Sequence, residues 1–351
     1  MKIIRMECRT HEMRLREPYT IAYETVDRCE NVFIRVFTDS GIVGMGCAAP
    51  DLPVTGETAN SVKDTFHDII EPLVRGRDPF TYARINDDLK TNAGKHPSAL
   101  AMIDMALYDI MAKKAGVPLY KFLGGYRHSI PTSITIGIMP LKETLEKARQ
   151  FLSEGFNILK LKGGEHVEED IEKVLKIREL GSEIEIRFDA NQGYDVRDAV
   201  YFIEKTRVAR IEVMEQPTDM GNEDLLKQVS QRVHVPVMAD ESLMTLKDVF
   251  RLTSNEATDM INIKLMKVGG ITEALHINSV AKAAGVEAMV GCMDESALGI
   301  HAGLHFALAR PNIIYADLDG HLDLLDDPFD GLVTLKDGIL YPGDFPGLSR
   351  D

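Results

Sequence analysis

The 351-residue chain has no long apolar segment, few cysteines and no excess of positive charge. No apolar run approaches the roughly 20 residues that a membrane-spanning helix requires, so the sequence predicts a protein that does not cross a membrane. The first residues, MKIIRMECRT, interrupt their apolar positions with charges and lack the continuous apolar region of a signal peptide. We therefore expect a cytoplasmic location.

The cysteines are scattered and form no CxxC pair, so neither a disulfide framework nor a structural zinc site is expected. The net charge of −15 disfavours non-specific binding to nucleic acid or to an anionic membrane. A hydrophobic content of 44% and a charged content of 27% are ordinary for a globular protein. The length allows either one large barrel with a smaller domain or two ordinary domains.

An alternation of strands and helices begins near residue 130. Short apolar or β-branched runs are followed by polar turns and helical stretches, and helix 141–154 ends in front of Gly155. We predict strands at 131–137, 157–162, 183–189, 211–215, 235–239, 259–264, 286–291 and 312–317. Such strands are parallel, and eight strand–helix units close into a barrel. The apolar period fails after Asp323, so the last helix is expected to be missing and the segment is expected to form loops and one short hairpin.

Residues 1–125 follow another plan, which predicts an α+β domain in front of the barrel. Runs at 2–8, 12–16, 31–38 and 42–48 are typical of antiparallel strands, and helical patterns follow at about 58–73 and 97–115. The connections 19–30 and 49–57 are expected to be loops that are long enough to reach over a neighbouring site.

Acidic residues stand at nearly even intervals at the downstream ends of three predicted strands. Asp189, Glu215 and Asp240 are 26 and 25 residues apart, about one strand–helix unit. Active sites of such barrels lie at the C-terminal ends of the strands, so these carboxylates should meet there. A lone acid in such a place is usually a loop cap, but three in consecutive units, without His or Cys, indicate a site for a hard cation such as Mg²⁺.

Lysines flank this acidic set. Lys160 and Lys162 share one face of a strand, so both should point into the barrel, where mutual repulsion and desolvation are expected to lower the pKa of at least one. Lys264 ends a later strand, whereas Lys267 is expected to be solvated. A divalent ion flanked by lysines can remove a proton from a carbon next to a carboxylate. The alternative is that the lysines lie on a polar surface strand.

The motifs KLK, FDANQG, EQP, ADES and INIKLMKVGG, with DMALYD and VPLYKFLGG ahead of them, resemble the muconate-lactonizing subgroup of the enolase superfamily over essentially the whole chain. The resemblance implies an α/β fold, a modified (β/α)7β TIM barrel over 126–324 with an α+β capping domain over 1–125 that residues 325–351 complete. It implies Asp189, Glu215 and Asp240 as ligands of one Mg²⁺ per subunit.

The same resemblance implies Lys162 and Lys264 as acid/base groups on opposite faces of the substrate. Lys160 would tune Lys162 and the substrate carboxylate, and Thr135 would lie close to the same substrate. Two bases on opposite faces permit removal of a proton on one side and its return on the other, which is the arrangement of an epimerase or racemase that works through an enediolate.

Residues at the end of the eighth predicted strand indicate which activity within the subgroup to expect. Asp317 and Asp319 resemble the Asp-x-Asp pair with which dipeptide epimerases hold the α-ammonium of the substrate, and a cation can bridge two such carboxylates. A solvated acidic turn is the simpler alternative. N-acylamino acid racemases and o-succinylbenzoate synthases of the subgroup share the lysines but would not favour an acid pair there. Cys47 departs from the family, in which this position usually carries Glu.

Specificity is predicted from three more acids. Ala-Glu epimerases resemble this chain but carry an Arg in the segment where TIAYETVDR offers Glu24, and Asp51 and Asp294 are expected to face the same cavity. We therefore predict a Mg²⁺-dependent dipeptide epimerase that prefers cationic dipeptides and forms a homo-oligomer. The alternatives are an N-acylamino acid racemase or o-succinylbenzoate synthase-like enzyme of the same subgroup and, more remotely, a barrel that binds a metabolite without converting it.

Overall fold

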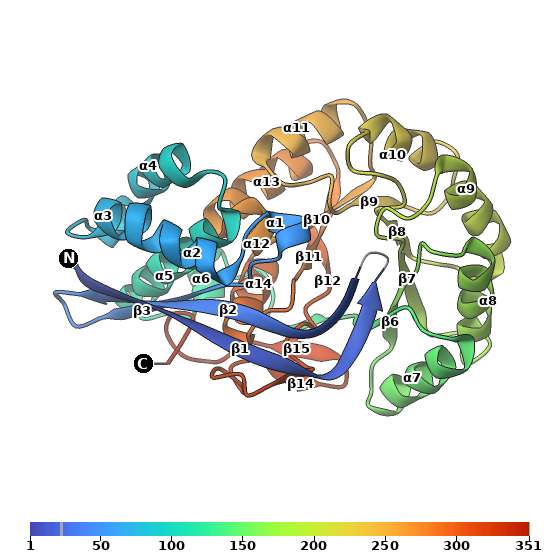
Figure 1. Cartoon of the computed structure of the whole chain (residues 1–351), viewed down its shortest axis with the longest axis horizontal. Helices are drawn as coiled ribbons and strands as arrows, with labels where there is room; N and C mark the ends of the chain where they lie inside the picture. The colour runs from blue at the N-terminus through green and yellow to red at the C-terminus, as the bar shows by residue number, and fades with distance from the viewer. Residues whose placement is uncertain (22–23, 351) are drawn as a thin grey trace.

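The described residues form three β-sheets (Figure 1). The computed structural model describes residues 1–21 and 24–350 and, at residues 21 and 24, the backbone alone. An eight-stranded sheet has the order β12-β11-β10-β9-β8-β7-β6-β5, a four-stranded sheet has the order β13-β1-β2-β3, and a small sheet has the order β14-β15-β4. The chain thus has an α/β fold built around the large curled sheet.

All neighbouring strands of the large sheet are parallel. Its strands are β5 (Ile134–Ile136), β6 (Ile158–Lys162), β7 (Glu185–Asp189), β8 (Val213–Glu215), β9 (Val237–Ala239), β10 (Met260–Lys264), β11 (Glu287–Gly291) and β12 (Ile313–Ala316). The helices between them are α7 (Leu141–Ser153), α8 (Val167–Arg178), α9 (Val196–Lys205) with the 3-10 turn η3 (Arg207–Ala209), α10 (Glu223–Ser230), α11 (Leu246–Ser254), α12 (Leu265–Val268), α13 (Ile271–Ala283) and α14 (Ala297–Ala309). A parallel bridge between Thr132 and Ala316 brings the two edges of the sheet together.

The eight parallel strands lie where the sequence predicts them, and no helix follows β12 within residues 313–350. One boundary differs. The expected strand 131–137 is divided into β4 (Ile130–Pro131) and β5, because Ile130 and Pro131 pair instead with the C-terminal strand β15 (Ile339–Tyr341).

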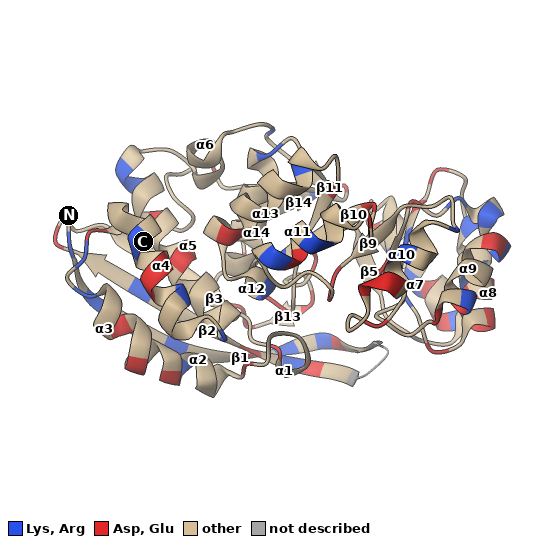
Figure 2. Ribbon diagram, turned by 90° about the horizontal axis from the view of Figure 1, so that it is seen from above, with Lys and Arg blue, Asp and Glu red and all other residues tan. Residues whose placement is uncertain are grey.

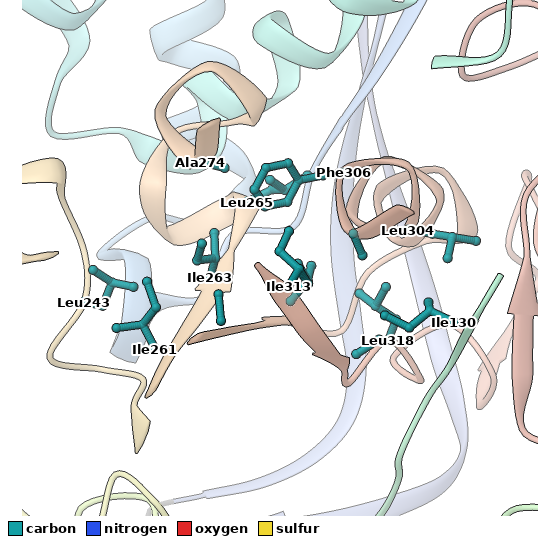
Figure 3. Packing of buried hydrophobic residues seen from close by; sticks show 14 of the residues in the cluster. Ile130, Leu243, Ile261, Ile263, Leu265, Ala274, Leu304, Phe306, Ile313 and Leu318 are labelled. Atoms are coloured by element: carbon teal, nitrogen blue, oxygen red, sulfur yellow. The ribbon is translucent and has the colours of Figure 1, made fainter. Parts of the chain in front are cut away.

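Strand β10 shows how one sequence builds both the core and the site. Ile261 and Ile263 pack in the core cluster with Leu265 and Phe306 of the surrounding helices (Figure 3). The alternate residue Met260 packs with Val213, Met238 and Met289 of neighbouring strands. Because side chains alternate along a strand, the face that holds Met260 also presents Asn262 and Lys264.

The N-terminal region combines a long antiparallel sheet with helices. Strands β1 (Ile3–Ile21), β2 (Glu24–Thr38) and β3 (Val43–Ala48) are followed by α1 (Leu52–Thr55), α2 (Ala59–Thr65), the π-helical turn η1 (Phe66–Ile70), α3 (Glu71–Val74), the 3-10 turn η2 (Pro79–Thr81), α4 (Tyr82–Ala93), α5 (Pro97–Ala115) and α6 (Leu119–Leu123). Helix α5 lies so close to β3 that a Cβ at Gly46 would come 1.9 Å from the Met102 carbonyl oxygen. Glycine at position 46 therefore sets the distance between the helix and the sheet.

The C-terminal segment returns to the N-terminal region. Strand β13 (Leu324–Leu325) pairs with β1 at Arg14 and Leu15, and β14 (Thr334–Lys336) forms a hairpin with β15. The sequence predicts this short hairpin.

The predicted loop 19–30 is wrong, and so is the separation of strands 2–8 and 12–16. One continuous strand, β1, covers both predicted strands and continues until Tyr19 pairs with Val26 and Thr20 with Thr25 of β2. β-Branched and aromatic residues favour such pairing. The register shifts between Arg14 and Tyr19, the interval that contains Pro18, which has no amide hydrogen to donate.

Acidic and basic residues lie together on outer helices such as α8 and α9 (Figure 2). Exposed pairs of this kind contribute little to stability. Among the described residues, no helix is both long and apolar enough to span a membrane.

Candidate active site

Parallel pairing places the predicted site residues at one end of the large sheet. Lys162 is paired with Asp189, and Asp189 with Glu215, across β6, β7 and β8. Asp240 directly follows β9, and Lys264 is the last residue of β10. The carboxyl ends of parallel barrel strands meet at one face, so residues far apart in sequence converge there.

The triad Asp189, Glu215 and Asp240 is fully enclosed. One carboxylate oxygen from each lies within 4.8 Å of the others, and the exposed fraction of each residue is at most 2%. The buried atoms Asn191 Oδ1 and Glu241 Oε2 have no hydrogen-bond donor among the described residues. Oxygen donors alone, concentrated in a buried site, fit one hard divalent cation such as Mg²⁺.

Lys160 lies at the centre of the acidic groups. Its ammonium is 2.8 Å from Glu215 Oε2, 2.8 Å from Asp317 Oδ2 and 3.1 Å from Asp189 Oδ2. Burial alone would lower the pKa of Lys160, but the surrounding carboxylates outweigh it and raise that pKa well above its usual value. Lys160 is therefore not a lysine of lowered pKa such as the sequence predicts for at least one of the pair, because three carboxylates contact its ammonium.

Lys162 and Lys264 approach the triad from opposite sides. Lys162 lies on β6 with its ammonium 2.8 Å from Asp189 Oδ2, and Lys264 ends β10 with its ammonium 2.8 Å from Asp240 Oδ2. Strands β7, β8 and β9, which carry the triad, lie between them. Burial disfavours the charged form of Lys264, but Asp240 reverses the effect and raises the pKa of this lysine.

The lysine charges in turn act on the triad. Burial alone would raise the pKa of Asp189, but Lys162 and Lys160 lower it to about 2. Burial and the charge of Asp189 raise the pKa of Glu215 to about 7. The site therefore balances desolvated carboxylates against lysines on both sides.

Lys267 is buried, and the prediction of a solvated lysine is wrong. Its exposed fraction is 1%, and its ammonium donates to Asp240 Oδ1 and, at 2.5 Å, to the Asp240 carbonyl oxygen. Burial lowers its pKa in spite of Asp240. The cause of the difference is α12, which turns the chain back over the end of β10.

Asn262 is a site residue that the sequence reasoning missed. Its Nδ2 donates to Glu215 Oε1 at 2.6 Å, and the residue is fully buried. The available signal was its spacing: Asn262 lies two residues before Lys264, on the same face of the strand.

The acid pair lies at the end of β12, next to β5. Asp317 accepts hydrogen bonds from Ser133 Oγ at 2.6 Å and from Lys160 at 2.8 Å, and Asp319 Oδ2 accepts the amide hydrogen of Thr135 at 2.7 Å. Burial and the charge of Asp317 raise the pKa of Asp319 to about 6. The structure thus brings Asp317, Asp319 and Thr135 together.

A cavity of about 440 Å³ opens over these groups. It is lined by predicted residues from both parts of the chain, namely Thr135, Lys160, Lys162, Asp240, Lys264, Asp317, Asp319, Asp51 and Asp294. Asp51 caps helix α1, where it accepts the Val54 amide hydrogen at 3.3 Å. The Glu24 side chain lies outside the described residues.

The antiparallel pair of β1 and β2, which we call the long hairpin, holds Asp294. The Tyr19 hydroxyl of β1 donates to its carboxylate at 2.9 Å, a contact that the sequence reasoning missed. Cys47 is linked to Asp294 through Asn31. The Cys47 thiol donates to Asn31 Oδ1 at 3.4 Å, and Asn31 Nδ2 donates to the Asp294 carbonyl oxygen at 3.0 Å. Cys47 is thus part of the support for the segment that carries Asp294.

The parallel sheet with lysines and carboxylates at the carboxyl ends of its strands defines the class of protein. Residues 143–351 match the enolase C-terminal domain-like family, and residues 3–124 match the N-terminal domain of mandelate racemase and muconate lactonizing enzyme. The chain belongs to this family, the enolase superfamily.

Similar proteins within this superfamily are named epimerases. The chain is 41% identical to L-Lys-D/L-Arg epimerase of Desulforapulum autotrophicum, with 99% of each protein covered. It is similar, at 39% identity and a TM-score of 0.97, to a substrate-liganded structure of L-Ala-D/L-Glu epimerase from Bacillus subtilis, covering 99% of this chain and 98% of the other. A structure of dipeptide epimerase from Enterococcus faecalis with Mg and L-Leu-L-Tyr matches at 38% identity and a TM-score of 0.96, with 99% of each chain covered.

Proposed function

We propose that the protein is a Mg²⁺-dependent dipeptide epimerase that inverts an α-carbon by 1,1-proton transfer through an enediolate. The observation that carries this proposal is the placement of Lys162 and Lys264 on opposite sides of the buried triad. Asp189, Glu215 and Asp240 would hold the ion. When bound, it supplies positive charge that stabilises the enediolate.

The lysines divide the proton transfer between them. One removes the α-proton from one face of the substrate, and the other returns a proton to the opposite face, so each acts as base in one direction and as acid in the other. Lys160, which the carboxylates keep charged, contributes a fixed positive charge beside Lys162 and the substrate carboxylate.

The acid pair selects a free amino terminus. Asp317 and Asp319 follow β12 and line the cavity beside Thr135 of β5, so the α-ammonium of a dipeptide can reach them while its carboxylate faces the triad. An N-acylated amino acid lacks this ammonium and would bring an uncharged or anionic group next to two acids, which disfavours the racemase alternative.

Asp51 and Asp294 support a preference for cationic side chains. Both line the cavity, Asp51 from the α1 segment and Asp294 from the end of β11. An acidic substrate side chain would lie next to these like charges, which costs several kcal/mol in a desolvated pocket. A Lys or Arg side chain would instead pair with the carboxylates. Glu24 remains a prediction from the sequence in the same role.

We further infer a (β/α)7β barrel over 126–324, with a capping domain over 1–125 that residues 325–351 complete. The bridge between Thr132 and Ala316 supports closure of the barrel, and the pairing of β13 with β1 supports the contribution of the C-terminal segment to the cap. A homo-oligomeric state and a cytoplasmic location remain expectations from the sequence, and light scattering tests the first.

The decisive experiment measures exchange of the α-proton in D₂O across a library of dipeptides, with Mg²⁺ and after exhaustive EDTA treatment. Values of kcat/KM for Ala-Lys, Lys-Ala, Lys-Lys, Ala-Glu and Ala-Phe then test specificity. We expect Mg²⁺-dependent exchange and the highest values for the cationic dipeptides. Activity without metal contradicts the proposed chemistry, and a preference for Ala-Glu contradicts the proposed specificity.

A further inference from the structure

Each carboxylate of the triad has one oxygen occupied by a donor that lies outside the cluster. The backbone amide of Asn191 donates to Asp189 Oδ1 at 2.9 Å, the Asn262 amide to Glu215 Oε1 at 2.6 Å, and the Lys267 ammonium to Asp240 Oδ1. We call Asn191, Asn262 and Lys267 the outer donors.

The second oxygen of each carboxylate faces the lysines of the cavity. Asp189 Oδ2 contacts Lys162 at 2.8 Å, Glu215 Oε2 contacts Lys160 at 2.8 Å, and Asp240 Oδ2 contacts Lys264 at 2.8 Å. Each triad carboxylate therefore turns one oxygen toward the cavity lysines, and an outer donor holds its other oxygen.

We propose that the outer donors restrict each triad carboxylate to binding through a single oxygen and thereby select Mg²⁺ over Ca²⁺. The inference rests on the proposed function, in which the triad holds a divalent ion. Ca²⁺ takes more oxygen ligands and commonly uses both oxygens of a carboxylate, whereas Mg²⁺ requires six ligands in nearly octahedral geometry and retains water. A site in which both oxygens of Glu215 or Asp240 could turn inward would suit Ca²⁺ better.

Two of the outer donors are side chains held in place by their surroundings. Asn262 is fully buried, and a Cβ at Gly291 would lie 2.5 Å from its Oδ1 and 2.8 Å from its Nδ2. The glycine at position 291 thus leaves the space that the Asn262 amide occupies.

Lys267 is fixed by several oxygens at once. Besides Asp240 Oδ1, its ammonium donates to the Asp240 carbonyl at 2.5 Å and to the Asn262 carbonyl at 3.4 Å, and the residue is 1% exposed. A buried ammonium with these partners cannot leave Asp240 without losing its countercharge. Lys267 and Asn262 are therefore positioning residues, since neither lines the inner face of the triad.

A purely structural role of Asn262 and Lys267 predicts a different effect on the binding of the two ions. If these residues only stabilised the strand ends, their loss would weaken every ion to a similar degree. Selection of one oxygen per carboxylate predicts instead that the ratio of the dissociation constants for Ca²⁺ and Mg²⁺ changes.

The test is isothermal titration calorimetry of the purified protein with Mg²⁺ and, separately, with Ca²⁺. The variants are Lys267→Met and Asn262→Leu, which remove a donor and keep nearly the same number of side-chain heavy atoms, and Gly291→Ala, which displaces the Asn262 amide without removing it. Lys227→Met, which replaces a partly exposed lysine of α10 that donates to the Asn255 carbonyl oxygen, is the matched control. Circular dichroism melting confirms that each variant is folded.

We expect the variants to bind Mg²⁺ about 10–100-fold more weakly, as is typical when a partner behind a metal ligand is lost. The affinity for Ca²⁺ should fall less or rise. The ratio of the dissociation constants (Ca²⁺ over Mg²⁺) should therefore fall at least about tenfold in these variants, whereas Lys227→Met should keep a value close to the original ratio. Folded variants that keep this ratio overturn the inference while leaving the proposed function intact. A starting protein that binds neither ion overturns the proposed function as well.

Discussion

The groups proposed for chemistry and those proposed for specificity lie on different kinds of structure. Lys162, Asp189 and Glu215 are strand residues whose neighbours are set by parallel pairing. Asp51 begins a short helix in a connection, and Asp294 follows β11 and takes a hydrogen bond from Tyr19 on the long hairpin. The first group is fixed by the sheet, and the second depends on contacts between the N-terminal region and the sheet.

This difference implies that the two groups can change independently. A strand residue moved by one position faces the other side of the sheet, so the chemical groups tolerate no shift in register. Residues in connections can be exchanged while the scaffold keeps its geometry. Variants in the two regions should therefore alter different kinetic parameters.

The largest effect is expected from the strand lysines. Lys162→Ala and Lys264→Ala should each lower kcat for epimerisation by about 10²–10⁴-fold, because each removes a group that takes or returns the proton. NMR in D₂O follows both inversion and isotope exchange, and one variant should still exchange the α-proton of a single stereoisomer. Full epimerisation by either variant would contradict the two-base mechanism.

A smaller and more selective effect is expected from the specificity group. Asp294→Asn should lower kcat/KM for Lys-containing dipeptides about tenfold, or about 1.4 kcal/mol, with little change for Ala-Phe. Tyr19→Phe keeps the carboxylate and should alter the preference less. Asp344→Asn, at an exposed position, is the control. An equal loss of kcat/KM for charged and apolar dipeptides would show that Asp294 does not distinguish substrates by side-chain charge.

The acid pair should give a pH dependence of comparable size. Burial and Asp317 raise the pKa of Asp319 to about 6, so this carboxylate is charged above that pH and loses its charge as the pH falls through it. Because kcat/KM reports the free enzyme, it should fall about tenfold for each unit below pH 6 at saturating Mg²⁺. Asp319→Asn should have low activity without this limb. The same acidic limb in that variant would assign it to another group.

The smallest effect is expected outside both regions. Thr245 caps α11 by accepting the Asp248 amide hydrogen at 3.3 Å, and the Asp248 side chain accepts the Thr245 amide hydrogen in return. Thr245→Ala should lower the free energy of unfolding by about 1 kcal/mol, measured by urea denaturation, without changing kcat/KM. A change in kcat/KM would show that the outer helices influence the site.

The parallel sheet and the inner site were predictable because local patterns determine them. Regular spacing places Asp189, Glu215 and Asp240 on successive strands, and the alternation in KLK sets the direction of both lysines. The absence of a helix after β12 within residues 317–350 was visible in the sequence as the loss of the apolar period.

The remaining features depend on contacts between distant segments. The extension of β1 through residues 19–21 and of β2 back to Glu24 depends on pairing across a register shift, which no local pattern shows. The burial of Lys267 follows from the direction that α12 takes, and the raised pKa of Lys160 follows from Asp317, more than 150 residues away in the chain. Such effects are absent from the sequence until the fold brings the partners together.

The pairing of β13 with β1 also affects how the protein is synthesised. Arg14 and Leu15 of β1 pair with residues 324–325, which leave the ribosome more than 300 residues later. Until then the edge of β1 at Arg14 and Leu15 lacks this partner, and its amide and carbonyl groups can pair with another chain. Truncation before residue 324 should therefore cause aggregation of newly made chains, and the β1–β2 pair above the cavity acquires this support only after residues 324–325 have been synthesised.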